Sequence, residues 1–171
     1  AARKELGATE RKLDRLAERI DSLYEQMAGH DHSDYAGLAR LDAELKAAEA
    51  QLAAARAAYL AAAGALTRAR QSAGESLAEA VMTELAPLKL DKARFQVAVE
   101  PLGEDRAGPS GMDRTAFEIA TNPGAPFGDL GAIASGGELA RFALALKASL
   151  AGRASGAQPL MIFDEVDQGV G

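Results

Sequence analysis

The feature that most constrains the fold of this chain is a long apolar seam between residues 38 and 73. Apolar and small side chains recur there at alternating spacings of three and four residues, the pattern of a heptad repeat. The seam positions are Leu38, Leu41, Leu45, Ala48, Leu52, Ala55, Tyr59, Ala62, Leu66, Ala69 and Ala73. The pattern predicts one long helix, and its alanines would let a partner helix approach closely.

Beyond residue 73 the seam slips in phase, as in a stutter that locally unwinds a supercoil. It resumes at Leu77, Val81 and Leu85. Gly64 and Gly74 each cost about 1 kcal/mol relative to alanine in a helix, so we interpret them as candidate flexible points. Pro87 is expected to end the helix.

A shorter seam precedes the long one and predicts a second helix. Its positions are Leu13, Leu16, Ile20, Leu23 and Met27. Residues 1–8 are expected to form a loop or frayed helix start, with Thr9 as a candidate cap, and the polar residues 29–34 predict a turn. The two helices can pair as an antiparallel hairpin. Because the first is about half as long as the second, much of the long seam is expected to lack a partner in this chain, and we infer that the partner precedes residue 1.

The segment after the helices predicts strands. Phe95, Val97 and Val99 alternate with polar residues, and residues 116–121 return as a second strand closed by an Asn-Pro-Gly turn. Residues 103–111 between them are polar and rich in glycine, which is typical of a loop.

A Gly-Gly turn then opens a further helix. Ser135 can cap this helix, and Glu138 completes the spacing of a capping box. Gly136 and Gly137 have no Cβ atom, so a ligand can approach the backbone closely. The N-terminal end of a helix presents free N–H groups and a partial positive charge, which suits a phosphate. The alternative is an ordinary capped helix after a glycine turn.

Two carboxylates follow an apolar run near the C-terminal end. Residues 160–163 predict a strand buried on both faces, and Asp164 and Glu165 would lie at its carboxyl end, where open α/β sheets place ligands. One carboxylate can hold Mg²⁺ through water while the other orients or deprotonates an attacking water. The alternative is a strand that ends in a solvated acidic turn.

Composition excludes several classes of function. The chain has 171 residues, a formal net charge of −6 and no cysteine, so disulfides, cysteine-ligated zinc and thiol catalysis are excluded. Basic residues gather in the first segment, at Arg3, Lys4, Arg11, Lys12, Arg15 and Arg19. They can contact DNA phosphates, or they can form a mixed solvated face with the acidic residues between them. The alanine-rich residues 53–66 are too short and too weakly apolar to span a bilayer, so no membrane association is expected.

The Gly-Gly turn and the carboxylates together resemble a known family. Residues 135–138 resemble the signature motif of ABC-type ATPases, and residues 160–165 resemble their Walker B strand and catalytic glutamate. Residues 113–114, 117–118, 121–124 and 163–171 are similar to one branch, the RecN family of SMC-like ATPases for the repair and recombination of DNA double-strand breaks. The resemblance with specific motifs covers roughly residues 85–171.

The resemblance implies composite nucleotide sites with ATP and Mg²⁺ as cofactors. Four residues would contact the γ-phosphate of ATP bound to the opposite head of a dimer: Ser135, Gly136, Gly137 and Glu138. Asp164 would serve Mg²⁺, and Glu165 would be the general base. Asp167 would belong to a D-loop over residues 167–171. Gly171 stands where many ABC proteins carry aspartate. The RecN branch also has glycine at this position.

The fold expected from these features is α+β. Residues 1–86 would form an arm of long, antiparallel-type coiled-coil helices with its tip near residues 29–34, and residues 87–171 a partial ABC-ATPase head lobe with a β-hairpin, the signature helix and the Walker B strand. The chain lacks a Gly-x-x-x-x-Gly-Lys-Ser/Thr phosphate loop, so it is expected to be inactive alone.

By the same resemblance, the N-terminal half of the same protein would supply the Walker A lobe and the outgoing coil. The full-length protein would be an ATPase that forms a homodimer through ATP-sandwiched heads and acts on DNA in the cytoplasm, associated with the nucleoid. The alternative is a non-enzymatic coiled-coil scaffold or interaction protein.

Overall fold

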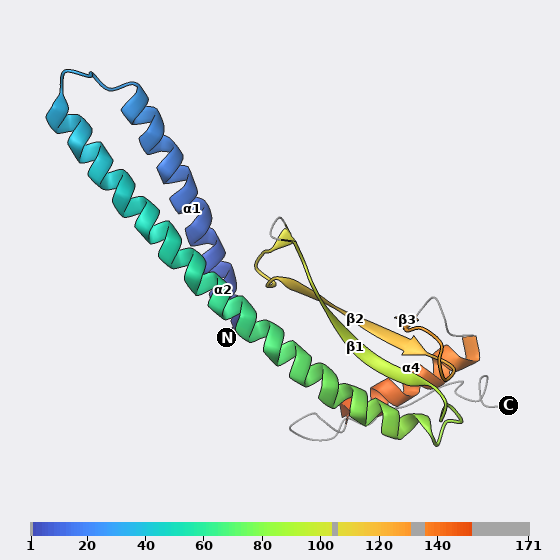
Figure 1. The fold of residues 1–171 in the computed structure, drawn as a ribbon. Helices are drawn as coiled ribbons and strands as arrows, with labels where there is room; N and C mark the ends of the chain where they lie inside the picture. Colours follow the sequence, from blue (N-terminus) through green and yellow to red (C-terminus); the bar gives the residue numbers. More distant parts are fainter. Residues whose placement is uncertain (1, 104–105, 131–135, 152–171) are drawn as a thin grey trace. The chain divides into compact units, whose positions relative to one another are not determined.

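The computed structural model describes residues 2–103, 106–130 and 136–151 of the chain. The elements in order are α1 (Ala2–Ala28), α2 (Tyr35–Leu85), β1 (Arg94–Pro101), β2 (Asp113–Ala120), β3 (Gly128–Asp129) and α4 (Gly136–Ala151) (Figure 1). Long helices combined with a small sheet confirm the expected α+β class. None of the helices described here combines the length and apolarity that a bilayer span requires.

The chain forms two compact units. The first comprises Ala1–Arg68 and Pro101–Asp113, and the second comprises Ala69–Glu100 and Arg114–Gly171. Helix α2 therefore contributes its longer, N-terminal part to the first unit and its last turns to the second. The division predicted at residue 86 stays a prediction.

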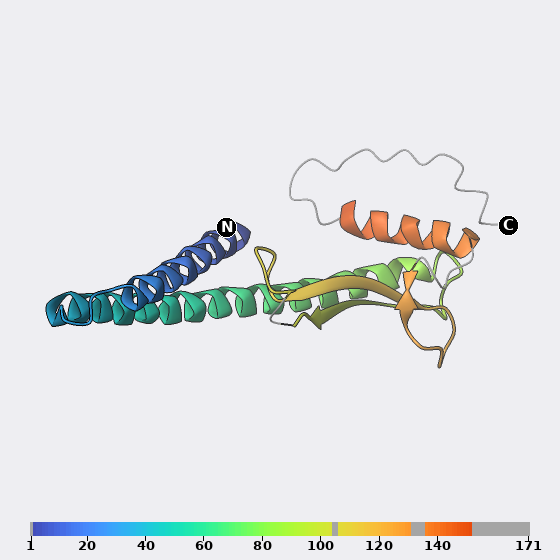
Figure 2. The same ribbon diagram turned by 90° about the horizontal axis from the view of Figure 1, so that it is seen from above.

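In the first unit, α1 and the N-terminal part of α2 lie side by side as an antiparallel helical hairpin (Figures 1 and 2). Their contact is an apolar cluster of Ile20, Leu23, Leu45 and Ala48, with Met27, Leu41 and Leu52 packed against it. All five positions of the shorter predicted seam are buried or half-buried. The periodicity therefore correctly identified the face of α1 that packs on α2.

Helix α1 begins earlier than the sequence suggested. Of the two expected forms of residues 1–8, a loop or a frayed helix start, the loop is wrong, because α1 starts at Ala2. Thr9 is not a cap, because its hydroxyl donates a hydrogen bond of 2.9 Å to the Glu5 carbonyl inside the helix. The physical reason is Leu6, which is fully buried in a cluster with Tyr59 and Ala63. Burial of this side chain extends the helix by further turns.

A glycine-rich turn between β1 and β2 completes the first unit. Gly108 and Gly111 exchange two backbone hydrogen bonds of 3.2 and 2.9 Å, and Gly111 has a φ of 99°, which glycine adopts without strain. Ala107 and Met112 in this turn pack against the cluster that contains Tyr59. The expectation that the seam lacks a partner beyond the shorter helix is therefore wrong at residues 59–66, where this turn and the start of α1 cover it.

The second unit contains a three-stranded sheet in the order β1-β2-β3. Strand β3 pairs antiparallel with β2, with Ile119 opposite Gly128. Between β1 and β2 the Gln96 amide donates to the Glu118 carboxylate at 2.7 Å. Both long strands were predicted from apolar alternation, whereas β3 has only two residues and too little pattern to be recognised.

The core of the second unit joins α2, the sheet and α4. It consists of Val81, Leu85, Leu90, Ala93, Phe95, Ile119, Phe142 and Ala145. The ring centroids of Phe95 and Phe142 are 5.2 Å apart in a tilted arrangement, a favourable geometry for aromatic pairs. Helix α4 is thus fixed to β1 by its buried face.

Gly74 is a close-packing position in this unit. A Cβ atom on Gly74 would lie 2.9 Å from the Cβ atom of Val97 on β1, closer than real side chains approach. The same test at Gly64 meets only the Arg68 guanidinium, at 3.6 Å. The interpretation of Gly74 as a flexible point is therefore corrected: the glycine lets helix and strand approach.

Candidate functional site

The predicted Gly-Gly turn lies at the start of α4, which begins at Gly136. Gly136 is exposed, and a Cβ atom there would meet nothing within 4 Å. Gly137 and Glu138 follow in the first helical turn and are half-buried. The first four N–H groups of a helix have no partner within the helix, so the backbone at Gly136 is open to an approaching acceptor.

The face of α4 behind this turn is held firmly. Phe142 and Ala145 are fully buried in the core of the second unit, and the Ser149 hydroxyl donates a hydrogen bond of 2.8 Å to the Ala145 carbonyl. A rigid helix with an open N-terminal end is suited to present its N–H groups to an anion.

Arg141 connects the first turn of α4 to a distant segment. Its Nη1 atom donates to the carbonyl oxygen of Leu88 at 3.2 Å, and its Nε atom donates to the carbonyl oxygen of Gly137 at 3.3 Å. Sequence reasoning assigned no role to Arg141. The only signal was its place one turn after the glycines, which does not reveal a partner 53 residues earlier.

The segment that Arg141 reaches is the C-terminal end of α2. Beyond Leu85 the Leu90 N–H donates to the Leu85 carbonyl at 3.0 Å and the Lys89 N–H donates to the Ala86 carbonyl at 3.1 Å. Lys89 has a φ of 58°, and no other non-glycine residue in the described part of the chain has a positive φ. This is the Schellman arrangement that closes many helices. Helix α2 thus ends at Leu85, two residues before Pro87, and Pro87 lies within the closing turn.

The remaining predicted site residues lie outside the described ranges. They are Ser135, Asp164, Glu165 and Asp167, and the predicted Walker B strand at residues 160–163 lies there with them. The structure therefore brings together Gly136, Gly137 and Glu138 at one helix end.

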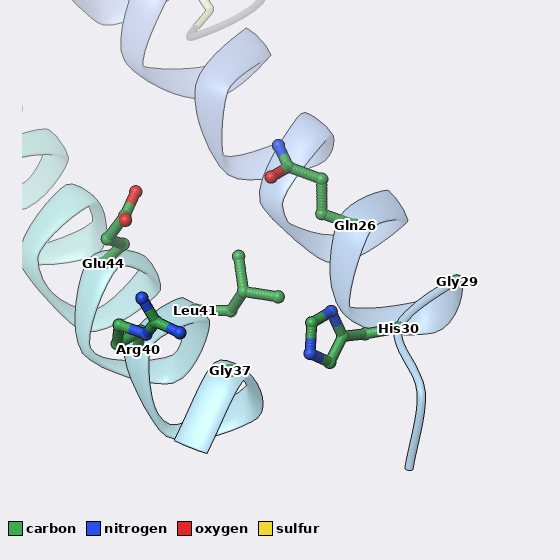
Figure 3. A pocket seen from close by; sticks show the side chains of 7 residues that line it. All are labelled: Gln26, Gly29, His30, Gly37, Arg40, Leu41 and Glu44. Carbon is green, nitrogen blue, oxygen red and sulfur yellow. The ribbon is translucent and has the colours of Figure 1, made fainter. Parts of the chain in front are cut away.

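A pocket of about 470 Å³ lies at the tip of the helical hairpin in the first unit (Figure 3). It is lined by Gln26, Gly29, His30, Gly37, Arg40, Leu41 and Glu44. His30 points from the turn towards α2, and Leu41 faces it from α2 (Figure 3). In the part of the chain that the structure describes, no three or more His, Asp or Glu side chains gather as metal ligands would.

Asp34 organises this tip as the N-cap of α2. Its Oδ1 atom accepts a hydrogen bond of 2.9 Å from the Gly37 N–H, and its Oδ2 atom lies 3.0 Å from His30 Nε2. The Gly37 N–H, followed by the His30 side chain, lowers the pKa of the Asp34 carboxyl below its ordinary value of 3.8. The predicted turn at residues 29–34 is confirmed as a capped helix start.

One basic residue of the first segment forms an ion pair across the hairpin. Arg19 on α1 forms an ion pair of 2.8 Å with Glu44 on α2, and both side chains are largely exposed. A solvent-exposed ion pair contributes little to stability and leaves the guanidinium accessible.

These features define an α+β protein with a helical hairpin, a small antiparallel sheet and a helix that opens on a glycine pair. No family model matches the chain. The chain is 42% identical over 106 residues to "DNA repair protein RecN" of Rickettsia prowazekii, covering 62% of this chain and 18% of that protein. It is 42% identical over 117 residues to the protein of the same name from Streptomyces coelicolor, covering 63% of this chain and 20% of that protein.

The similarity to a third relative extends over most of the chain. The chain is 30% identical over 162 residues to "DNA repair protein RecN" of Vibrio cholerae, covering 93% of this chain and 29% of that protein. The chain thus belongs to the RecN family, as the resemblance of its motifs predicted. It spans less than a third of the length of the curated relatives it matches.

Proposed function

We propose that this chain is part of an SMC-like ATPase that acts in the repair and recombination of DNA double-strand breaks. In this proposal it supplies the signature motif, the Walker B strand and the returning helix of a coiled-coil arm. The observation that carries the proposal is the open N-terminal end of α4, where the Gly-Gly pair leaves the backbone uncovered. The similarity to proteins named for DNA repair supports it.

The signature residues would act on a nucleotide held by another head. Helix N–H groups at Gly136 and Gly137 would donate hydrogen bonds to the γ-phosphate oxygens, and Ser135 and Glu138 would complete the contact. When bound, ATP supplies the phosphoanhydride bond that is hydrolysed, and Mg²⁺ offsets the charge of its phosphates. The first-turn N–H groups of α4 would orient the phosphate and stabilise its negative charge.

Asp164 and Glu165 would have separate roles in ATP hydrolysis. Asp164 would hold the Mg²⁺ site, and Glu165 would accept the proton of the attacking water. Asp167 would take part in contacts between the heads. Because the chain contains no Walker A loop, the N-terminal half of the same protein would supply the phosphate loop and the outgoing coil.

Dimerisation of the full-length protein tests the signature assignment. We expect ATP to drive dimerisation of the wild-type protein and expect Ser135→Arg to abolish it, because a long cationic side chain fills the space of the phosphate. Lys92→Met, an exposed change outside the turn, serves as the control. Analytical ultracentrifugation with and without ATP measures the effect. ATP-driven dimers that persist in Ser135→Arg would count against the assignment.

ATP hydrolysis by the full-length protein tests the role of the Glu165 carboxylate. Glu165→Gln in the full-length protein is expected to lower kcat by about 10²–10⁴-fold, the usual contribution of a general base, while ATP binding is retained. The 171-residue chain alone is expected to show no turnover. Turnover by the isolated chain that Glu165→Gln abolishes would contradict the need for a second lobe. A scaffold without enzymatic activity would show neither dimerisation by ATP nor turnover in any form.

A further inference from the structure

The guanidinium of Arg141 contacts two backbone carbonyls that belong to different elements of the second unit. One is the Leu88 carbonyl in the turn that closes α2, 3.2 Å from Nη1, and the other is the Gly137 carbonyl in the first turn of α4, 3.3 Å from Nε. Arg141 is half-buried, so these hydrogen bonds are partly shielded from water. Hydrogen bonds from a charged donor are the stronger class in proteins.

The contact at Leu88 has a clear electrostatic reason. The last carbonyls of a helix have no N–H partner within the helix and carry the negative end of its dipole. In the Schellman turn that closes α2, Leu85 and Ala86 receive their hydrogen bonds from Leu90 and Lys89. The Leu88 carbonyl receives its hydrogen bond from Arg141. The guanidinium is thus a cationic cap for α2 that comes from another helix.

The contact at Gly137 acts where the backbone is least constrained. Glycine has more conformational freedom than any other residue, and two of them open α4. Among the residues that the structure describes, and leaving aside the backbone of α4 itself, none has a heavy atom within 4 Å of where a Cβ atom on Gly136 would lie. The hydrogen bond from Arg141 Nε to the Gly137 carbonyl adds a side-chain contact to the backbone of this turn and does not involve its N–H groups.

We propose that Arg141 is a positioning residue for the signature turn. It fixes the first turn of α4 against the capped end of α2, so that the free N–H groups at Gly136 and Gly137 keep the orientation that a triphosphate requires. The inference rests on the proposed function, because it assigns Arg141 a role in the same site. It adds a link between two segments: the glycine turn and the turn after α2 are hydrogen-bonded to one guanidinium.

The planar shape of arginine matters for this role. Its Nη1 and Nε donors point in fixed directions from one rigid group, so both carbonyls are held at once. A lysine at this position keeps the positive charge but offers a single ammonium on a flexible stem. Lysine is therefore expected to preserve the cap of α2 in part and to hold the glycine turn poorly.

The test uses the full-length protein with Arg141→Met, Arg141→Lys and the control Lys92→Met. We expect Arg141→Met to weaken ATP-driven dimerisation about tenfold, the loss that follows removal of one charged hydrogen bond. Arg141→Lys is expected to fall between wild type and Arg141→Met. Binding of a fluorescent ATP analogue to monomers, measured by anisotropy, is expected to stay unchanged, because the analogue occupies the other lobe. The kcat for ATP should fall while KM stays near the wild-type value.

Hydrogen exchange separates positioning from general stability. In Arg141→Met we expect faster exchange of the amides at residues 136–138 and at residues 88–90, with no change in the helical hairpin. Exchange that accelerates throughout the second unit, with dimerisation reduced in proportion, would mean a merely structural role and would overturn the inference. If Arg141→Met does not fold, Arg141→Lys gives the same comparison.

Two outcomes distinguish this inference from the proposed function. Wild-type dimerisation in Arg141→Met and Arg141→Lys, together with loss of dimerisation in Gly136→Arg, would overturn the role of Arg141 and leave the signature assignment intact. Wild-type dimerisation in Gly136→Arg would overturn the signature assignment itself.

Discussion

The hydroxyl of Tyr59 donates a hydrogen bond of 2.9 Å to the backbone carbonyl of Gly108, 49 residues further along the chain. Tyr59 is 6% exposed and packs beside the fully buried Leu6 and Ala63. The polar end of the ring thus reaches a carbonyl of the glycine-rich turn, while the ring itself fills the apolar cluster. This one side chain joins α2 to the turn between β1 and β2.

Removing that hydroxyl should destabilise the first unit. We expect Tyr59→Phe to lower the free energy of unfolding by about 0.5–1.5 kcal/mol, the usual net value of such a hydrogen bond. Urea unfolding followed by circular dichroism measures the change. Tyr35→Phe, at a residue 79% exposed, provides the matched control and should have no measurable effect. Equal stabilities of Tyr59→Phe and wild type would contradict the contribution assigned to this contact.

The same residue predicts a dependence on alkaline pH. Burial, and then the negative charge of Glu10, raise the pKa of the Tyr59 phenol above its ordinary value of 10.0. The neutral phenol is favoured in the folded chain, so this contribution to stability is complete below pH 10 and is lost as pH rises through the folded-state pKa. Between pH 9 and pH 12, wild type should lose more stability than Tyr59→Phe. Parallel profiles of the two proteins would refute the assignment.

Gly64 and Gly74 should respond oppositely to the same change. Gly64→Ala should raise the free energy of unfolding by about 0.5–1 kcal/mol, because alanine favours the helix and the new Cβ atom meets only Arg68 at 3.6 Å. Gly74→Ala should lower it by about 1–3 kcal/mol, because its Cβ atom would lie 2.9 Å from that of Val97. Thermal unfolding of both variants gives the comparison. Gly74→Ala combined with Val97→Ala should recover part of the loss, and a double variant no better than Gly74→Ala would argue against the clash.

The tip of the helical hairpin allows a titration experiment. A Cβ atom on Gly37 would collide with the Asp34 carboxylate and the His30 ring, so Gly37→Ala must displace the cap of α2. We expect the pKa of Asp34 to rise towards 3.8 in this variant, because the Gly37 N–H is the main cause of its depression. NMR titration of the Asp34 carboxyl measures it. Gly29→Ala, whose Cβ atom would meet only the Glu25 carbonyl at 3.6 Å, is the control.

The sign of the associated stability change follows from the lowered pKa. A carboxyl that is more acidic in the fold stabilises the fold above pH 3.8, and that contribution is lost as pH falls through the folded-state pKa. Wild type should therefore lose stability on acidification below pH 4 more steeply than Gly37→Ala. The same slope in both proteins would show that the cap does not titrate as described.

The turn after α2 offers a stabilising substitution. Lys89 adopts a φ of 58°, a left-handed conformation in which glycine avoids the steric cost that other residues bear. Lys89→Gly is expected to raise the free energy of unfolding by up to about 1 kcal/mol, after the entropy cost of glycine is subtracted. Lys92→Gly, three residues later and without a positive φ, should instead lower it. A stability loss in Lys89→Gly would contradict the strain inferred at this position.

The sequence predicted those parts of the fold whose cause is local. The spacing of Leu16, Ile20 and Leu23 identified the buried face of α1, because burial on one side of a helix leaves a periodic record. The alternation of Phe95 with polar neighbours located β1 for a similar reason. The Gly-Gly turn was placed correctly at the start of α4. Of the site, only Gly136, Gly137 and Glu138 are among the residues that the structure describes.

The features that the sequence did not predict depend on contacts between residues far apart in the chain. Leu6 extends α1 because it packs against Tyr59, a residue 53 positions later, and no local pattern records such a contact. Gly64 and Gly74 look alike in the sequence of one helix, and only Val97 on a neighbouring strand distinguishes them. Arg141 was overlooked because both of its acceptors are backbone carbonyls, which carry no sequence signal.

The cap that Arg141 provides has a consequence for the order of synthesis. Leu88 leaves the ribosome 53 residues before the arginine that holds its carbonyl, an interval of about 3–10 s at ordinary translation rates. During that interval the growing chain contains the whole of α2 but not the Arg141 guanidinium that donates to the Leu88 carbonyl. The backbone hydrogen bonds of the closing turn can therefore form before the Leu88 carbonyl meets Arg141, which follows all three strands in the sequence.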